Sequence, residues 1–392
     1  MLSQIEGSRA VAETVGHCRP QVICAYPISP QTHIVEALSA LVKSGRLTAC
    51  EFVNVESEFA AMSVAIGASA AGARAYTATA SQGLLYMAEA LYNASGLGLP
   101  IVMTVANRAI GAPINIWNDH SDAMSQRDSG WIQLYAEDNQ AAADLHVLAF
   151  RLAEELSTPV MVCMDGFVLT HAVEAVDVPS QAAVDRFLPA FQPRQVLDPD
   201  APLTIGAMVG PEAFTEVRYL AHTNQLRALA RLPELADQFA ATFHRDLDAL
   251  VSPYRCDDAS TVVVALGSVL GTLKDTVDGM RTAGMPIGVL GLTAFRPFPA
   301  AAIKTAIGAA KRIVVLERAF AAGAGGIVSA DLAPVLPADR ELYTVVAGLG
   351  GRPVTRDSLR ETLAAAFAGR LAPLTFLDLD ERLLRAAEEV PS

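Results

Sequence analysis

The chain has 392 residues, of which 52% are hydrophobic and 18% charged, and its formal net charge is −13 at pH 7. This composition is typical of a globular protein with a large core, and it excludes a disordered chain, a collagen or a coiled coil. The acidic balance argues against nucleic acids and anionic membrane surfaces as partners, because like charges repel. At roughly 100–200 residues per domain, the length predicts two or three domains.

The five cysteines are scattered, with no C-x-x-C pair and no histidine at a metal-binding interval from them. We therefore expect neither a disulfide framework nor a zinc or iron–sulfur site, and no metal site of any kind on this chain. No stretch supplies the roughly 20 apolar residues that span a membrane. The first residues carry charges where a signal peptide would be apolar. Together these features predict a cytoplasmic protein.

The first half of the chain alternates short apolar runs with helical stretches. The expected elements, in chain order, are a strand at 22–26, a helix from about residue 30, a strand at 52–55, a helix from residue 57, strands at 75–80 and 100–105, a helix at 140–156 and a strand at 159–163. This β-α-β alternation predicts an α/β fold, with a doubly wound parallel sheet covered by helices on both faces.

A proline-bearing stretch breaks this alternation after residue 188, and a long polar helical segment follows from about residue 211 to residue 250. We interpret this region as a helical connector. A second α/β alternation then begins, with expected strands at 261–266, 287–292 and 313–317. The sequence thus predicts two doubly wound domains, one at 1–250 that includes the connector and one at 251–392.

Several familiar catalytic motifs are absent or incomplete. The glycine-rich segment 323–328 follows an expected strand, but Val328 stands where a dinucleotide fingerprint has its third glycine. No acidic residue follows at the usual interval, which argues against a nicotinamide site. The chain contains neither a G-x-S-x-G elbow nor an H-E-x-x-H helix, so serine-hydrolase and zinc-protease functions are not expected.

One loop concentrates residues that can carry chemistry. It follows the expected strand at 100–105 and includes Arg108, the polar run 115–122 and Trp131. Ligands bind at the carboxyl ends of strands in open parallel sheets, which favours a functional loop. The alternative is a solvated loop with its own salt bridges, but that alternative does not explain the large aromatic side chain of Trp117. Glu58 is a second candidate, although an acid in the first turn of a helix can simply complement the helix dipole.

Five short motifs occur in the order expected for one protein family. They are Tyr26-Pro27-Ile28-Ser29-Pro30, Glu56-Ser57-Glu58-Phe59-Ala60-Ala61, Thr79-Ala80-Ser81-Gln82-Gly83-Leu84, Asn107-Arg108-Ala109 and Asn118-Asp119-His120-Ser121-Asp122. Together they resemble the α subunit of 2-oxoacid:ferredoxin oxidoreductases. The resemblance continues through residues 265–268 and 292–299, so it covers most of the chain.

The resemblance implies a thiamine-diphosphate enzyme. This chain would supply the pyrimidine-binding domain and then a transketolase C-terminal-like domain. Neither Asp165 nor Asp278, each followed by glycine, is preceded by the glycine of the family's diphosphate motif. A partner β subunit is therefore expected to carry the diphosphate and Mg²⁺. Subunits of γ and δ type would carry a further domain and ferredoxin-like iron–sulfur clusters, and this chain alone would be inactive.

The resemblance also assigns roles to residues. Glu58 would hydrogen-bond the aminopyrimidine ring of the cofactor and favour the tautomer that removes the thiazolium proton. Ser81 and Gln82 would contact the cofactor. Arg108 would meet the substrate carboxylate with two charge-assisted hydrogen bonds. Ser29 stands where relatives often carry threonine, and its hydroxyl would hydrogen-bond the substrate in a slightly roomier pocket.

Asn118, Asp119 and His120 are expected to shape the substrate pocket or its closing loop. The implied reaction is oxidative decarboxylation of a 2-oxoacid to an acyl-CoA and CO₂, with coenzyme A as a substrate and ferredoxin or another acceptor taking the electrons. Pyruvate is the first choice, and phenylglyoxylate and branched-chain 2-oxoacids are alternatives. A transketolase-like enzyme complete in one chain and a non-catalytic assembly subunit are the other hypotheses that remain open.

Overall fold

The protein is described by a computed structural model that covers residues 2–388. Its first half contains β1 (Ser3–Glu6), α1 (Gly7–His17), β2 (Val22–Ala25), α2 (Thr32–Lys43), β3 (Glu51–Asn54), α3 (Glu58–Ala70), β4 (Ala75–Thr79), α4 (Ser81–Tyr86), α5 (Ala88–Gly96), β5 (Val102–Asn107), α6 (Ser121–Ser125), β6 (Ile132–Tyr135), α7 (Asn139–Leu156), β7 (Val160–Asp165), β8 (Val173–Val176) and α8 (Gln181–Phe187).

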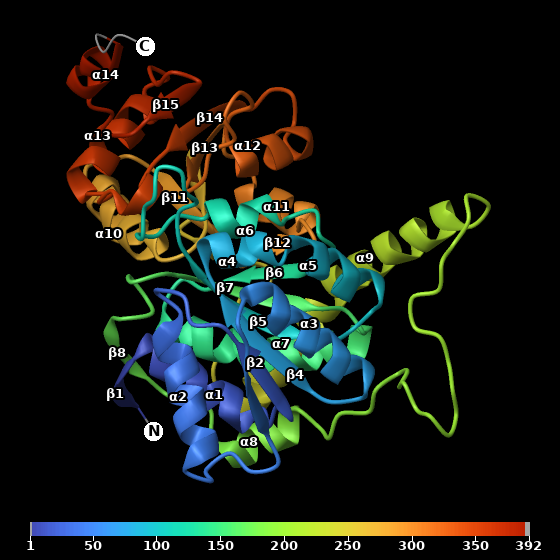
Figure 1. Cartoon of the computed structure of the whole chain (residues 1–392). Coiled ribbons are helices and arrows are strands. Elements are labelled where there is room, and N and C mark those ends of the chain that lie inside the picture. The colour runs from blue at the N-terminus through green and yellow to red at the C-terminus, as the bar shows by residue number, and fades with distance from the viewer. Residues whose placement is uncertain (1, 389–392) are drawn as a thin grey trace.

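Helix α9 (Phe214–Phe243) begins the second half. It is followed by β9 (Val251–Tyr254), β10 (Thr261–Ala265), α10 (Val269–Thr282), β11 (Ile287–Leu292), β12 (Ala294–Arg296), α11 (Ala300–Ile307), β13 (Arg312–Glu317), α12 (Ile327–Leu332), β14 (Glu341–Val346), α13 (Arg356–Phe367), β15 (Leu374–Phe376) and α14 (Glu381–Glu388). Two larger sheets organise these elements (Figure 1), so the prediction of an α/β fold with two sheets is confirmed.

The first sheet has the strand order β12-β6-β7-β5-β4-β2-β3, and all its pairs except β12 with β6 are parallel. Side chains alternate between its faces, as the pleat requires. In β5, Val102 packs in the core formed by α1, α2 and α7, whereas Met103 and Val105 pack in the core on the side of α3 and α5. Because helices cover both faces, the central strands β5 and β7 are buried along their whole length and are mostly apolar.

The second sheet has the order β15-β14-β13-β10-β11-β9, in which only β9 is antiparallel to its neighbour. The two sheets share one apolar core. Met62 and Leu91 beside the first sheet belong to the same buried cluster as Val262, Leu290 and Ile313 of the second. The relative position of the two sheets is therefore fixed by packing.

A strand exchange strengthens this junction. Directly after β11, the chain leaves the second sheet and forms β12 on the edge of the first, where Ala294 pairs with Leu134. The backbone N–H of Tyr135 also donates to the carbonyl of Thr293 at 2.7 Å. The sequence predicts the strand at 287–292 and misses this three-residue continuation.

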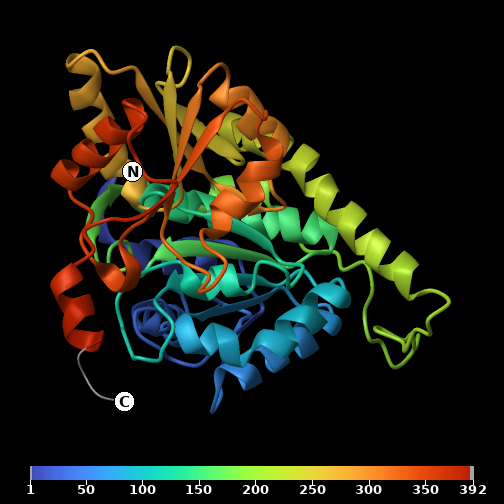
Figure 2. The ribbon, with the colours of Figure 1, turned by 90° about the horizontal axis from the view of Figure 1, so that it is seen from above.

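The expected connector is found as an irregular segment followed by α9, which extends from the body of the molecule (Figure 2). The first turns of α9 are exposed, and from Asn224 onwards the helix packs on the rest of the first domain. Nδ2 of Asn224 donates to the carbonyl of Leu156 at 3.0 Å, and Leu232 and Phe239 are buried. Among residues 2–388, no helix is both long enough and apolar enough to cross a bilayer.

Candidate active site at the ends of β4 and β5

The turn from β4 to α4 has a strained backbone. Ser81 has a φ of 49°, in the left-handed region that costs a non-glycine residue about 1–2 kcal/mol. Its N–H donates to Oδ2 of Asp122 at 2.9 Å, and its hydroxyl donates to the carbonyl of Ala109 at 2.5 Å. These bonds offset the strain and fix the direction in which Gln82 leaves the turn.

Asp122 joins this turn to the end of β5. Its Oδ2 also accepts the N–H of Arg108 at 3.0 Å, while Oδ1 accepts Nδ2 of Asn107 and the N–H of Ala123, both at 2.8 Å. Burial raises the pKa of Asp122, and the hydrogen bonds from Asn107, Ser81, Arg108 and Ala123 oppose that rise. One buried carboxylate thus positions both loops of the candidate site.

Arg108 is a nearly buried cation whose guanidinium is surrounded by neutral acceptors. Nη1 donates to the carbonyl of Ser29 at 2.8 Å, Nε to the carbonyl of Asn115 at 3.3 Å, and Nη2 lies 3.5 Å from Oε1 of Gln82. Burial lowers the pKa of Arg108, against the attraction of Asp122. Across residues 2–388 no carboxylate forms an ion pair with Arg108, so the guanidinium retains donors for an anion.

Glu58 begins α3, where the hydroxyl of Ser57 accepts the N–H of Ala60 at 3.2 Å and caps the helix. The Glu58 side chain is 9% exposed. Its Oε1 would lie 2.7 Å from a Cβ added to Gly83, and Oγ1 of Thr79 would lie 2.6 Å from the same Cβ. No donor within the described part of the chain bonds the Glu58 carboxylate, and Oγ1 of Thr79 is buried without a partner.

Five of the predicted site residues therefore lie in one continuous group. Glu58 contacts the turn that carries Ser81 and Gln82, and Gln82 in turn reaches Arg108, which holds the backbone of Ser29. The Ser29 contact is made by its carbonyl, and its hydroxyl forms no bond with any residue that the structure describes. The roles predicted for these residues remain predictions.

The other three predicted substrate residues lie in the segment where the first half of the chain meets the second half. Oδ2 of Asp119 accepts the N–H of Gly350 at 3.0 Å, and Nε2 of His120 lies 2.6 Å from Oδ1 of Asp165. Asn118 is buried, and no residue in the described range bonds its Nδ2. Asp119 and the N–H of His120, which donates to the carbonyl of Arg318 at 2.8 Å, hold the loop against the second half of the chain. Contact of the three residues with substrate stays a prediction.

Asp165 is the centre of a buried ionic network between the two sheets. Besides His120, it accepts the N–H of Ser268 at 3.1 Å, and Nη1 of Arg318 lies 3.6 Å away. Burial acts to raise the pKa of Asp165, but the attraction and hydrogen bond of His120 and the charge of Arg318 lower it well below its usual range. Asp278 pairs instead with Tyr254 and Arg255 on the surface. Both aspartates thus already have protein partners.

The glycine-rich segment 323–328 leads into α12, and its end is held by a buried glutamate. Glu317, at the end of β13, accepts the N–H groups of Val328 at 3.3 Å and Ser329 at 2.7 Å. A carboxylate of the chain itself therefore occupies the start of α12, where a dinucleotide fingerprint would hold phosphate. Burial raises the pKa of Glu317, while the backbone hydrogen bonds lower it.

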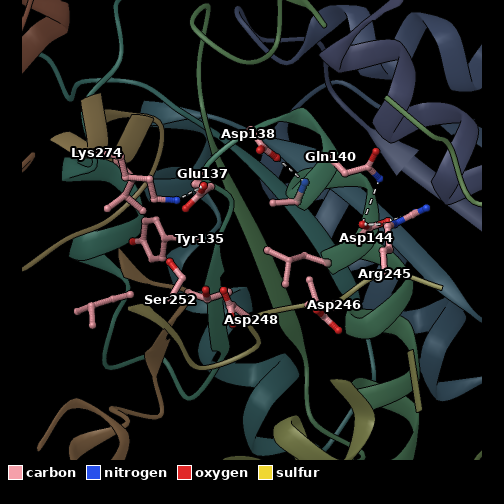
Figure 3. Close-up of a pocket in the computed structure, with 16 residues that line it drawn as sticks. Tyr135, Glu137, Asp138, Gln140, Asp144, Arg245, Asp246, Asp248, Ser252 and Lys274 are labelled. Atoms are coloured by element: carbon pink, nitrogen blue, oxygen red, sulfur yellow. Dashed lines mark hydrogen bonds and ion pairs between the residues drawn. The ribbon is translucent and has the colours of Figure 1, made fainter. Parts of the chain in front are cut away.

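A separate cavity of about 200 Å³ lies between α7, the segment after α9 and α10 (Figure 3). Four of its charged side chains form two ion pairs: Nζ of Lys274 lies 2.6 Å from Oε1 of Glu137, and Nη2 of Arg245 lies 2.5 Å from Oδ1 of Asp144. It contains none of the predicted site residues. We therefore assign no catalytic function to this cavity.

Comparison with known proteins identifies the family. Residues 13–236 match the family described as pyruvate flavodoxin/ferredoxin oxidoreductase, thiamine diP-bdg, and residues 259–359 match pyruvate:ferredoxin oxidoreductase core domain II. The pyruvate synthase subunit PorA of Methanosarcina barkeri is 47% identical over 97% of both chains. The chain belongs to the pyruvate flavodoxin/ferredoxin oxidoreductase family. The predicted membership, that of an oxidoreductase subunit of this family, is confirmed.

The relatives of this oxidoreductase subunit are named for two substrates, pyruvate and ketoisovalerate. PorA of Thermotoga maritima is 42% identical over 94% of this chain and 95% of its own length. The ketoisovalerate oxidoreductase subunit VorA of Pyrococcus abyssi is 38% identical over 90% of each chain. Family membership is therefore compatible with more than one 2-oxoacid.

The fold of the oxidoreductase subunit is also found in a solved enzyme. The 2-oxoglutarate:ferredoxin oxidoreductase of Magnetococcus marinus, with 2-oxoglutarate, coenzyme A and succinyl-CoA bound, superposes with a TM-score of 0.75 at 18% identity. The match covers 93% of this chain and 65% of that one, so this chain spans about two thirds of the solved polypeptide. At this identity the likeness establishes the fold alone.

Proposed function

We propose that this chain is the subunit of a pyruvate:acceptor oxidoreductase that holds the aminopyrimidine end of thiamine diphosphate and the substrate carboxylate. The main support is the Glu58 carboxylate, which is almost buried, packs closely over Gly83 and lacks a donor in the described chain. A buried carboxylate without a partner is costly, so a ligand that supplies a donor there is favoured. The family match names thiamine diphosphate as that ligand.

The residues fit this cofactor. When bound, thiamine diphosphate supplies the carbon nucleophile that attacks the 2-oxo group and holds the electrons left after CO₂ departs. Glu58 accepts a hydrogen bond from the aminopyrimidine ring, and its low-dielectric surroundings strengthen that bond. Oγ1 of Thr79, buried and unpartnered, is a second polar atom at the same place. Ser81 and Gln82 shape the neighbouring wall and keep the ring in position.

Arg108 binds the substrate carboxylate in this proposal. Three of its donors hold Ser29, Asn115 and Gln82, which orients the guanidinium, and the remaining N–H groups are available for an anion. Since no carboxylate of residues 2–388 forms an ion pair with Arg108, the substrate carboxylate supplies that partner. A planar guanidinium can make two parallel bonds to a carboxylate, so it also fixes the orientation of the 2-oxo group.

Partner subunits complete the enzyme. Asp165 and Asp278 are committed to pairs within this chain, which supports a diphosphate and Mg²⁺ site on a β subunit. All five cysteines are free thiols, four of them buried, so we assign the iron–sulfur clusters to γ- and δ-type subunits and the complex to the reducing cytoplasm. We place the division between the two domains of this chain at residue 250, just before β9.

Pyruvate is the proposed 2-oxoacid, with coenzyme A taking the acyl group and ferredoxin or another acceptor taking the electrons. The relatives named for pyruvate are 42–47% identical, against 38% for the one named for ketoisovalerate. A branched-chain acid remains the second candidate because that relative covers the chain almost equally. Phenylglyoxylate, an aromatic 2-oxoacid, completes the set to be compared.

The test begins with the complex purified from its source under anaerobic conditions. Its subunits, thiamine diphosphate, magnesium and iron are quantified, and viologen reduction is followed with coenzyme A and each of pyruvate, 2-oxoisovalerate and phenylglyoxylate. We expect iron-bearing partners, bound thiamine diphosphate and a preference for pyruvate. A chain that purifies alone, without partners or cofactor, contradicts the proposal.

A variant separates catalysis from assembly. Glu58→Gln should assemble and bind thiamine diphosphate but lose about 10²–10⁴-fold in turnover, the usual contribution of a group that promotes proton transfer. Glu56→Gln is the matched control, because Glu56 is an exposed acid two residues away. Equal activity of the two variants would favour a non-catalytic assembly subunit.

A further inference from the structure

Three segments that are far apart in the sequence place metal-binding groups together on the face of the first sheet that carries α1 and α2. They are Glu6 at the end of β1, His33 in the first turn of α2, and His171 two residues before β8. One ligand atom from each side chain lies within 4.8 Å of the other two. Oε1 of Glu6 is 2.6 Å from Nδ1 of His33, and the two imidazole rings are 4.4 Å apart, centroid to centroid.

The backbone around this cluster is well supported. Strands β1 and β8 pair in antiparallel register, with Glu6 opposite Val173. The N–H of Ser8 and its hydroxyl both donate to the carbonyl of Thr170, at 2.9 and 2.7 Å. Glu6 and His171 are therefore held side by side whatever their side chains bind. A site of this kind needs only small side-chain rotations to close on an ion.

The hydrogen bonding of His171 suits a ligand. Its Nδ1 lies 2.7 Å from Oγ1 of Thr170, a contact that orients the ring and leaves Nε2 for a metal. The Glu6 and His33 side chains are 31% and 47% exposed, so an ion and its water ligands can reach the cluster.

We propose that Glu6, His33 and His171 form a binding site for one divalent transition-metal ion, with Zn²⁺ as the first candidate and water completing the coordination. Two imidazoles and one carboxylate are a donor set typical of Zn²⁺, Co²⁺ or Ni²⁺, whereas Mg²⁺ and Ca²⁺ prefer oxygen ligands. Bonds of about 2.0–2.2 Å from a common centre are within reach of atoms this close together. No sequence motif predicts this site, because its ligands have no regular spacing along the chain.

The position of the site indicates a structural effect. It would link β1, the start of α2 just after Ser29, and the segment after β7, where the ring of Phe167 lies 4.9 Å from His171 and 5.0 Å from Trp117 of the candidate active-site loop. A bound ion would therefore stabilise one wall of that region. Binding to the folded state alone raises Tm with metal concentration.

The test uses the full-length chain, produced without a histidine tag, stripped with a chelator and dialysed against Zn²⁺. We expect one Zn²⁺ per chain and a Tm that rises with free Zn²⁺, neither of which Mg²⁺ reproduces. The variants His33→Ala, His171→Ala and Glu6→Gln should each weaken binding at least tenfold, and Co²⁺ should give visible absorption that the variants lose.

The control is His222→Ala, which removes an exposed histidine from α9 and should bind Zn²⁺ like the parent chain. The metal-free Tm of each variant shows whether the fold is intact. Because the His33 side chain is exposed, His33→Ala should fold normally even if another variant does not. Equal Zn²⁺ binding by the parent and a His33→Ala/His171→Ala double variant, or no stoichiometric Zn²⁺ on the parent, would overturn the proposal.

Discussion

Oδ2 of Asp122 lies 3.0 Å from the backbone nitrogen of Arg108, and the same oxygen accepts the N–H of Ser81 at 2.9 Å. Oδ1 accepts two more hydrogen bonds, so the Asp122 carboxylate accepts four hydrogen bonds and donates none. An amide cannot replace it, because its NH₂ group would face two N–H donors. The loop carrying Arg108 and the turn carrying Gln82 therefore depend on a charged group that never needs to touch substrate.

Asp122→Asn should consequently impair both stability and activity. Leaving two buried N–H groups unpaired costs about 2–6 kcal/mol, and the displaced guanidinium should raise KM for the 2-oxoacid more than it lowers kcat. Thermal unfolding and steady-state kinetics of the assembled complex measure the two effects. Asp128→Asn, at an exposed position of the same loop, should change neither. A stable Asp122→Asn complex with an unaltered KM would refute the positioning role.

Arg108→Lys tests the proposed carboxylate contact. An ammonium group keeps the charge but cannot hold Ser29, Asn115 and a bidentate ligand in one plane, so KM should rise about 10–100-fold with a smaller change in kcat. Arg127→Lys is the control, since Arg127 makes a single side-chain bond to the carbonyl of Met124 that lysine can copy. Unchanged KM in Arg108→Lys would mean that the substrate carboxylate binds elsewhere.

The sequence predicts the regular parts of the fold well and the junctions poorly. Strands such as β5 and β7 are mostly apolar, as expected where both faces are buried, and their polar residues are Thr104, Asn107 and Asp165. Strand β6 escaped prediction because buried Gln133 interrupts its apolar run, and its side-chain bond to the carbonyl of Ala123 exists only in the folded chain. Strand β12 is too short for any periodicity, and its edge position follows from the packing of the two halves.

The candidate site shows the same division. Arg108 could be singled out because it follows a strand of a parallel sheet, whereas Glu58 stood out only through the family motif. Asp122 was part of a motif, but its four hydrogen bonds depend on two turns that meet in space. His120 and Asp165 form a buried pair although they are 45 residues apart in the sequence, so no local sequence pattern could predict this contact.

Gly83→Ala tests the space around Glu58. The new Cβ would lie 2.7 Å from Oε1 of Glu58 and 2.6 Å from Oγ1 of Thr79, so the carboxylate must move. The substitution should therefore lower thiamine-diphosphate affinity and turnover, measured by cofactor titration and viologen reduction. Gly96→Ala is the matched control, since a Cβ at that helical glycine meets nothing within 4 Å. Equal cofactor affinity in the two variants would show that cofactor binding does not depend on the position of the Glu58 carboxylate over Gly83.

Buried His146 of α7 makes the stability of the fold depend on pH. His146 has its Nδ1 2.6 Å from the carbonyl of Ala142 and its Nε2 2.6 Å from the hydroxyl of Thr104, which in turn contacts Tyr76. Burial lowers the pKa of His146 from 6.5 to about 4, although the bond to Ala142 opposes this. As the pH falls, the unfolded chain therefore takes up the proton before the folded chain does.

This difference makes His146 a source of acid sensitivity. Its contribution to stability is complete above pH 6.5 and is lost as the pH falls towards 4, with about 2 kcal/mol lost by pH 5. His146→Gln should show a smaller fall in Tm between pH 7.5 and pH 5 than the parent chain, whatever its Tm at pH 7.5. His222→Gln, at an exposed histidine, should fall like the parent. The pKa of Asp165 is lowered from 3.8, so protonation of Asp165 affects stability only below this pH range. Identical dependence of Tm on pH in His146→Gln and the parent would exclude a neutral buried His146.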